Sequence, residues 1–254
     1  MSEDAKRLVQ EQFSQNAEAY VTSVTHGRGA SLKRIVELTQ PHPDELALDV
    51  ATAVGHTALA LAPRVDRVIG LDITPAMMVP ARRLAAERNI ANVEWTIGDV
   101  EDLPLSDESF DIVVCRIALH HWPDAPRGIR EMARVAKPRG RVVLVDNVVP
   151  PDVTLAQFVN HYERVRDPSH HWCYPLDELT AMVGAAGLRV TLTETLDKPT
   201  AFDDWVKRMN TPAEQMEELH RLMHSPEAAA TIRPEGINGV LYFHLTEAIV
   251  SAVK

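Results

Sequence analysis

The stretch LALDVATAVGHTALALAPRVDRVIGLD, from Leu46 to Asp72, decides the fold of this chain. An apolar run at 46–50 and a second at 68–72 flank a short Ala- and Leu-rich pattern, which predicts a strand, a tight turn, a helix and a strand. Such a βαβ unit places the amides of the first turn and the N-terminus of the helix beside the end of the second strand. A carboxylate at that end, here Asp72, can accept hydrogen bonds from both hydroxyls of a ribose. The stretch therefore predicts a nucleoside-binding site.

The turn after the first strand reads Asp49-Val50-Ala51-Thr52-Ala53-Val54-Gly55 and contains one glycine. Dinucleotide-binding turns carry glycines spaced G-x-G-x-x-G, so that the backbone can approach a pyrophosphate. The missing glycines disfavour a nicotinamide oxidoreductase, although that class stays open together with a buried βαβ crossover that binds nothing.

The same stretch resembles motif I of the class I methyltransferases that use S-adenosylmethionine, D-x-G-x-G-x-G followed by an acidic residue at the end of the second strand. Asp49, Gly55 and Asp72 match this pattern, and Ala51 and Ala53 stand at two of its glycines. An alanine adds a methyl group beside the ligand and disfavours a positive φ angle. A second alternative is therefore a methyltransferase fold with an altered cofactor loop that performs other chemistry or senses a ligand.

Later segments extend the resemblance to the small-molecule methyltransferases of the ubiquinone and menaquinone type. They are the Gly98-Asp99 turn and the turn Lys137-Pro138-Arg139-Gly140 before the strand 141–146. The resemblance implies an α/β, Rossmann-like fold of seven strands, six parallel and an antiparallel seventh, with helices on both faces. We expect a single domain, 1–254, with an N-terminal helical lid (1–44), a cofactor-binding core (45–150), and substrate-capping helices with the C-terminal strands (151–254).

The composition of the chain limits the classes of partner that we expect it to bind. Asp and Glu number 36 against 26 Lys and Arg, a net charge of -10, which argues against nucleic acid as a partner. The first residues, MSEDAKRLVQEQF, lack an apolar core, and no apolar run of about 18 residues occurs. Cys115 and Cys173 suggest no disulfide framework. We expect a cytoplasmic monomer or homodimer that acts on a small molecule and binds no membrane.

Hydrophobic periodicity and turn residues predict the remaining elements. Helices are expected at 4–22, 31–39, 75–89, 123–136, 153–166, 176–186 and 201–223, and further strands at 92–97, 112–116, 141–146, 188–194 and 240–250.

The stretch RIALHHWPD, from Arg116 to Asp124, follows the predicted strand 112–116, at the edge where open α/β sheets bind ligands. Arg116 and His120 are four residues apart, so one helical turn would bring them to one side. A neutral histidine can take an acidic proton near pH 7, and a guanidinium can stabilise the resulting anion. We predict His120 and Arg116 as the catalytic pair, while packing and capping remain the alternative role of these histidines.

The resemblance and the sequence order place further residues at the two sites. The expected cofactor-binding residues are Tyr20, His26, Asp49, Ala51, Ala53, Gly55, Asp72, Ile73, Met77, Asp99, Val100, Arg116 and His121. In related enzymes a helix after the fifth strand covers the substrate, which makes His161, Arg166 and His170 the substrate-side candidates. No metal is expected, because the adjacent histidine pairs lack the spacing of common zinc sites.

Overall fold

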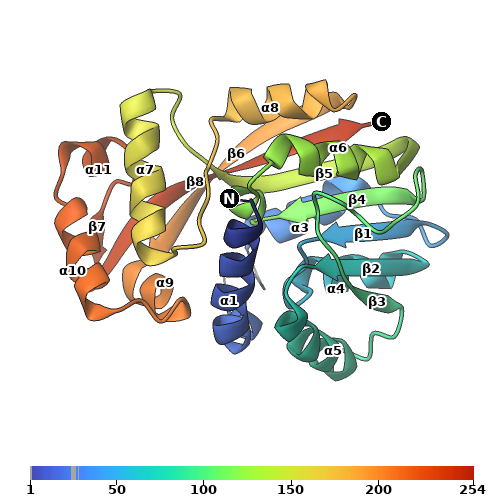
Figure 1. Ribbon diagram of the computed structural model, residues 1–254, viewed down its shortest axis with the longest axis horizontal. Helices are drawn as coiled ribbons and strands as arrows, with labels where there is room; N and C mark the ends of the chain where they lie inside the picture. Colours follow the sequence, from blue (N-terminus) through green and yellow to red (C-terminus); the bar gives the residue numbers. More distant parts are fainter. Residues whose placement is uncertain (1, 24–26, 28) are drawn as a thin grey trace.

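The computed structural model describes residues 2–23, 27 and 29–254, and its centre is a mixed sheet (Figure 1). The strand order is β3-β2-β1-β4-β5-β8-β6, with β7 paired to β8. The strands are β1 (Leu46–Val50), β2 (Arg67–Asp72), β3 (Val93–Ile97), β4 (Phe110–Arg116), β5 (Ala136–Val148), β6 (Arg189–Ala201), β7 (Glu235–Ile237) and β8 (Val240–Val253).

Strand directions confirm the predicted fold class. β1 to β5 pair parallel to one another, and β8 is antiparallel to both β5 and β6. β6 therefore runs in the direction of the first five strands, which gives six strands in one direction and one against them.

The short strand β7 is an eighth strand that the periodicity did not predict. It pairs with β8 through the turn Asn238-Gly239, where both φ angles are positive, 51° and 79°. Asn-Gly is the preferred pair for the tight turn that joins two antiparallel strands, so the signal was present in the sequence.

Ten helices are described along the chain. They are α1 (Ser2–Val21), α3 (Ala30–Thr39), α4 (His56–Leu61), α5 (Met78–Glu87), α6 (Ala125–Val135), α7 (Val153–Arg166), α8 (Leu176–Ala185), α9 (Phe202–Arg208), α10 (Ala213–Leu222) and α11 (Pro226–Ala230).

The predicted helix 201–223 is in fact two helices, α9 and α10, because the segment between them interrupts the pattern. Asn210 has a positive φ of 51°, and Pro212 precedes the first residue of α10. A proline disfavours the helical region for the residue before it, here Thr211.

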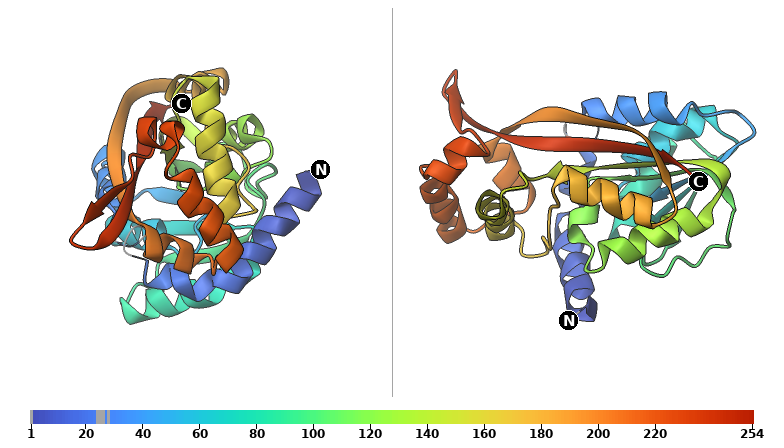
Figure 2. Two further views of the ribbon diagram at one scale, coloured as in Figure 1. Left: turned by 90° about the vertical axis from the view of Figure 1, so that its left-hand side faces the viewer. Right: turned by 90° about the horizontal axis from the view of Figure 1, so that it is seen from above.

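Alternate residues of each strand pack on opposite faces of the sheet, as the strand period of two requires. Ala47 and Ile112 belong to one buried cluster with Ile35 of α3 and Leu61 of α4, whereas Leu48 belongs to the cluster that includes residues of α6 and α8. Figure 2, seen from above, shows α3 and α4 on one side of the sheet and α6 and α8 on the other.

A second hydrophobic cluster lies where the long strands β6 and β8 extend past the sheet, among α7, α9, α10 and α11 (Figure 1). The rings of Tyr162 and Trp205 stack with centroids 5.1 Å apart, and Phe243 of β8 meets Tyr162 edge-on. This cluster holds α7 and α9 in place, and their polar residues enter the candidate site described next.

Candidate functional site

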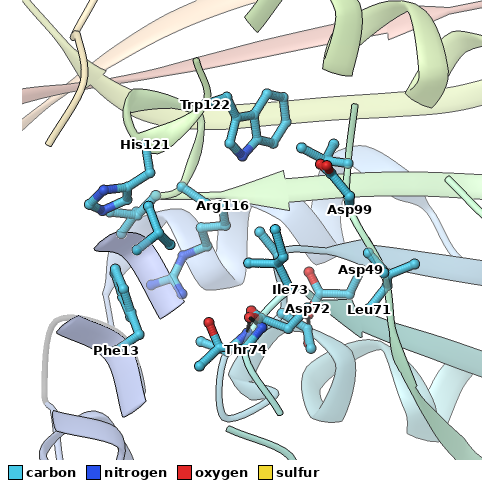
Figure 3. A pocket seen from close by; sticks show the side chains of 18 of the residues that line it. Phe13, Asp49, Leu71, Asp72, Ile73, Thr74, Asp99, Arg116, His121 and Trp122 are labelled. Atoms are coloured by element: carbon cyan, nitrogen blue, oxygen red, sulfur yellow. Dashed lines mark hydrogen bonds between the residues drawn. The ribbon is translucent and has the colours of Figure 1, made fainter. Parts of the chain in front are cut away.

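A cleft of about 960 Å³, partly open to solvent, lies at the carboxyl ends of β1, β2 and β4 and is covered by α1. Figure 3 shows Phe13 and His121 at one end of it and Asp99 and Leu71 at the other. The structure brings ten of the predicted cofactor residues to this cleft: Tyr20, Asp49, Ala51, Ala53, Asp72, Ile73, Asp99, Val100, Arg116 and His121.

Asp72 is a buried carboxylate at the end of β2. One oxygen accepts a hydrogen bond from the Ala53 amide and the other from the Thr74 amide, each at 2.8 Å. Burial raises its pKa, and the two amides oppose that shift. Because a carboxylate has about four acceptor positions, the two amides leave capacity for two hydroxyl groups of a ligand.

The two alanines of the turn after β1 adopt a left-handed conformation that glycine adopts more readily. Ala51 and Ala53 have φ angles of 53° and 48°, in the left-handed region that costs an L-residue about 1–2 kcal/mol. Gly55, at 86°, is not in contact with the cleft. A Cβ at Gly55 would lie 2.2 Å from the Trp95 ring, so glycine is required there by packing.

Asp49 fixes the other side of this turn. It is buried and accepts hydrogen bonds from Thr52 Oγ1 at 2.5 Å and from the Ala58 amide of α4 at 2.9 Å. Burial raises the pKa of Asp49 to about 7. Its two hydrogen bonds hold the turn against the start of α4.

The far end of the cleft contains an ion-pair cluster that the sequence analysis missed. Lys6 of α1 lies 2.7 Å from Asp99 and 2.6 Å from Glu101, and all three side chains line the cleft. The signal was the helical spacing, because Lys6 lies on the same face of α1 as Val9 and Phe13, which also line the cleft.

Met77, like Gly55, is a predicted cofactor residue that does not line the cleft. It is fully buried in the cluster between α1 and α5. Met77 is the last residue of the 3₁₀ turn Pro75–Met77, five residues after the end of β2, and it faces the core. His26 lies outside the described residues.

Arg116 and His120 do not share a helical turn, contrary to the expected geometry. Arg116 is the last residue of β4, and the 3₁₀ turn that contains His120 begins only at Leu119. Between them Ile117 has a φ of 56°, a strained conformation for a β-branched residue. Arg116 lines the cleft and donates to Ser31 Oγ at 3.1 Å, whereas His120 lines a second cavity.

The second cavity, of about 500 Å³, adjoins the cleft. Four residues line both spaces, namely Phe13, Tyr20, Ile117 and His121. The second cavity alone is lined by His120, Asn147, Glu163, Arg166, Lys198, Thr200, Trp205, Arg208 and Leu245.

His120 and Asp146 form a buried pair on this cavity. His120 Nδ1 lies 2.6 Å from Asp146 Oδ1, and the other carboxylate oxygen accepts the His120 amide at 2.9 Å. Burial lowers the pKa of His120, but the charge of Asp146 and its hydrogen bond outweigh burial and raise that pKa overall. Because an ionised carboxylate only accepts hydrogen bonds, Nδ1 carries the hydrogen when the ring is neutral and Nε2 is the basic nitrogen.

The three substrate-side candidates have different positions. Arg166 lines the second cavity, but His161 is exposed on α7 and lines neither space, because it points away from the sheet on the solvent side of the helix. His170 is buried behind the cavity, where Nε2 meets Asn160 Oδ1 at 2.8 Å and its ring stacks on His120. In the described part of the chain, no group of three or more His, Cys, Asp or Glu residues is arranged to hold a metal ion.

Comparisons with known proteins agree with this architecture. Residues 48–144 match the family described as methyltransferase domain. The chain is 38% identical to the uncharacterized methyltransferase YcgJ of Bacillus subtilis over 85% of this chain and 86% of that protein. The crystal structure of YcgJ superposes with a TM-score of 0.84 at 36% identity and covers 88% of this chain and 97% of YcgJ.

More distant matches have named activities. A demethylmenaquinone methyltransferase of Deinococcus radiodurans is 34% identical over 57% of this chain and 62% of its own length. An N-methyltransferase of Haemonchus contortus, solved with S-adenosylhomocysteine, shares the fold with a TM-score of 0.67 at 14% identity, over 96% of this chain and 60% of that protein. Among the helices described here, none has both the length and the apolar character needed to span a membrane.

Proposed function

Because this chain belongs to the class I methyltransferases, enzymes that use S-adenosylmethionine, we propose that its cleft binds this cofactor and that the adjoining cavity binds a small-molecule methyl acceptor. The observation that carries the proposal is the shared wall of Phe13, Tyr20, Ile117 and His121, across which the two spaces meet. A direct displacement needs donor and acceptor side by side and in line, which two adjoining spaces permit.

The donor set of the cleft fits the cofactor. Asp72 retains acceptor capacity for the two ribose hydroxyls after binding two amides. Asp99 lies at the far end and can accept from the adenine amino group, and the apolar side chains of Ile73, Val100 and Trp122 line the same space. The turn at Ala51 and Ala53 has positive φ angles, the conformation that the glycines of motif I would adopt readily.

The bound cofactor supplies an electrophilic methyl group on a sulfonium. On the acceptor side, His120 Nε2 takes the proton of the acceptor's hydroxyl, amine or acidic carbon. Asp146 holds the ring in the required tautomer through its contact with Nδ1. Asp146 is thus a positioning residue. A general base such as His120 typically contributes about 10²–10⁴-fold to the rate.

Arg116 belongs to the cofactor side of this account rather than to an acceptor-activating pair. It lines the cleft and is hydrogen-bonded to Ser31 of α3. We propose that its charge acts on the methionyl end of the cofactor, whose carboxylate a guanidinium can bind.

The relatives that methylate demethylmenaquinone support a small, aromatic acceptor, with carbon, oxygen or nitrogen as the methylated atom. A screen of small molecules with methyl-labelled S-adenosylmethionine will test the proposal. We expect labelled product with the wild-type protein, a loss of about 10²-fold or more with His120→Asn, and unaltered turnover with His42→Asn, an exposed control. No labelled product from any acceptor class, with the cofactor bound, would instead favour a fold that senses its ligand.

A further inference from the structure

Arg166 on α7 lines the second cavity with an unusually poor set of partners. Its side chain is 9% exposed, and its terminal nitrogen lies 3.6 Å from both Glu163 and Asp167, beyond the usual hydrogen-bond range. Nε is buried and has no hydrogen-bond partner among the described residues. The guanidinium carbon lies 4.7 Å from the centre of the Trp205 ring.

A buried guanidinium in this state is costly, because buried polar groups in native proteins are nearly always hydrogen-bonded. The planar guanidinium presents its N–H groups as a fork that matches the two oxygens of a carboxylate. The Trp205 ring packs against one side of the guanidinium. A planar anion in the second cavity would satisfy Arg166.

Two other cations and one carboxylate line the same cavity. Lys198 and Arg208 line it together with Arg166, and Glu163 is the one carboxylate residue among the described lining residues. Lys198 Nζ donates to Asn147 Oδ1 at 2.9 Å and lies 3.3 Å from Glu247.

Three other carboxylates, those of Asp146, Asp167 and Glu247, lie nearby but do not line the cavity, and Asp167 Oδ2 has no hydrogen-bond partner among the described residues. Asp167 Oδ1 accepts from the Ser169 amide at 2.9 Å and from its hydroxyl at 2.6 Å. Asp146 is held by His120. Arg166 and Lys198 therefore each have an acidic neighbour, and what favours an anionic ligand is that Arg166 lacks a hydrogen-bond partner within the usual range.

Glu163 requires a hydrogen-bond donor from the ligand, whereas Arg166 requires an acceptor. Its Oε1 is buried and has no partner among the described residues, and it lies one helical turn from Arg166 on α7. A ligand whose carboxylate meets Arg166 would satisfy Glu163 only if it also carried a donor nearby. Aromatic and apolar side chains, among them Phe13, Trp205 and Leu245, line the rest of the space.

We propose that the methyl acceptor is an aromatic acid, with a carboxylate that Arg166 binds and a neighbouring hydroxyl or amino group that donates to Glu163. This inference rests on the proposed function, since it names the class of molecule that the acceptor cavity takes. It assigns Arg166 and Glu163 to specificity and leaves the proton transfer to His120.

Calorimetric titration of the protein saturated with S-adenosylhomocysteine will test the class with three probes of matched size. Phenyllactate carries the acid and the hydroxyl, phenyllactamide lacks the charge, and hydrocinnamate lacks the hydroxyl. We expect Kd for phenyllactate to be lower than for either by about tenfold or more, because hydrogen bonds to charged groups contribute about 1.5–3 kcal/mol. Equal or tighter binding of the amide, or no binding of phenyllactate at millimolar concentration, would overturn the proposal.

Variants of the cavity residues test whether Arg166 binds the carboxylate of the acid. Arg166→Lys keeps the charge but loses the fork, so Kd for phenyllactate should rise about tenfold while that for phenyllactamide and for S-adenosylhomocysteine stays constant. Arg221→Lys, at an exposed position on α10, is the control. If Arg166→Lys fails to fold, Glu163→Gln should reduce the preference for phenyllactate over hydrocinnamate, and an unchanged preference in that variant refutes the proposal. Undiminished acid binding in the folded variant refutes the assignment, whereas failure of S-adenosylhomocysteine to bind the wild-type protein counts against the proposed function.

Discussion

Asp146 is one residue that connects the fold to the proposed chemistry. It is the predicted end of the strand 141–146, and in the structure it lies within β5, buried and in contact with His120. The sequence predicted His120 as a site residue but not its partner, because the pair joins the 3₁₀ turn after β4 to a residue of β5 that is 26 positions away in the chain. Nothing in the periodicity of either segment encodes that contact.

A pH profile tests this pair. Since the pKa of His120 is raised, turnover should fall as the pH drops through a value above the ordinary 6.5, where the ring becomes protonated and can no longer accept a proton. Asp146→Asn removes the charge that raises this pKa. The variant should therefore lose about 10²-fold or more in turnover and shift its acidic limb to lower pH. If the acidic limb of Asp146→Asn stays at the pH of the wild type, Asp146 does not set the pKa of the catalytic base, and the proposed role of the pair is wrong.

The alanines of the turn give a second prediction at this scale. Their positive φ angles mean that Ala53→Gly relieves strain of about 1–2 kcal/mol, which offsets the 0.5–1 kcal/mol of backbone entropy that glycine loses. We expect a melting temperature that is unchanged or slightly higher, and a lower Kd for S-adenosylhomocysteine in calorimetry. Weaker binding in the glycine variant would mean that the turn is adapted to a different ligand.

At the scale of elements, the parallel strands were predictable because each is an apolar run closed by a turn signal, and burial on both faces leaves little else that such runs can form. The split between α9 and α10 and the strand β7 were missed, although Asn210, Pro212 and Asn238-Gly239 carried both signals. Turn residues decide such boundaries, and hydrophobic periodicity alone does not register them.

The helix α1 covers the cleft, and Lys6 attaches it to the far end through Asp99 and Glu101. Lys6→Met should therefore speed proteolytic cleavage within α1 of the ligand-free protein about fivefold, roughly the loss of 1 kcal/mol of attachment. Arg7→Met is the matched control, because Arg7 is exposed and pairs within α1. Equal cleavage of both variants would show that α1 is held by its apolar face alone.

For the molecule as a whole, two of the hydrophobic clusters correspond to two tasks. The sheet and its helices build the cleft, and the cluster around Tyr162 and Trp205 positions the residues of the second cavity. The sequence predicted the first part well, because family motifs cover it. The second cavity could not be predicted from the sequence, since tertiary packing assembles it from segments far apart in the chain. They are α1, the 3₁₀ turn at 119–121, β5, α7, β6, α9 and β8.

Ligand-induced stabilisation provides a test on the intact protein. S-adenosylhomocysteine at 100 times its Kd should stabilise the folded state by about 2.7 kcal/mol and raise the melting temperature by roughly 5–10 °C. NAD at the same concentration should leave the melting temperature unchanged. A larger shift with NAD would reverse the assignment of the cleft.

The central claim, that the cleft at the ends of β1, β2 and β4 binds S-adenosylmethionine through Asp72, is tested most directly by titrating S-adenosylhomocysteine into the wild-type protein and Asp72→Ala. Two charge-assisted hydrogen bonds of about 1.5–3 kcal/mol each predict that Kd rises at least about tenfold in the variant. Asp177→Ala, exposed at the start of α8, should bind as the wild type does. An unchanged Kd in folded Asp72→Ala would contradict the account, because the cofactor would then be held elsewhere.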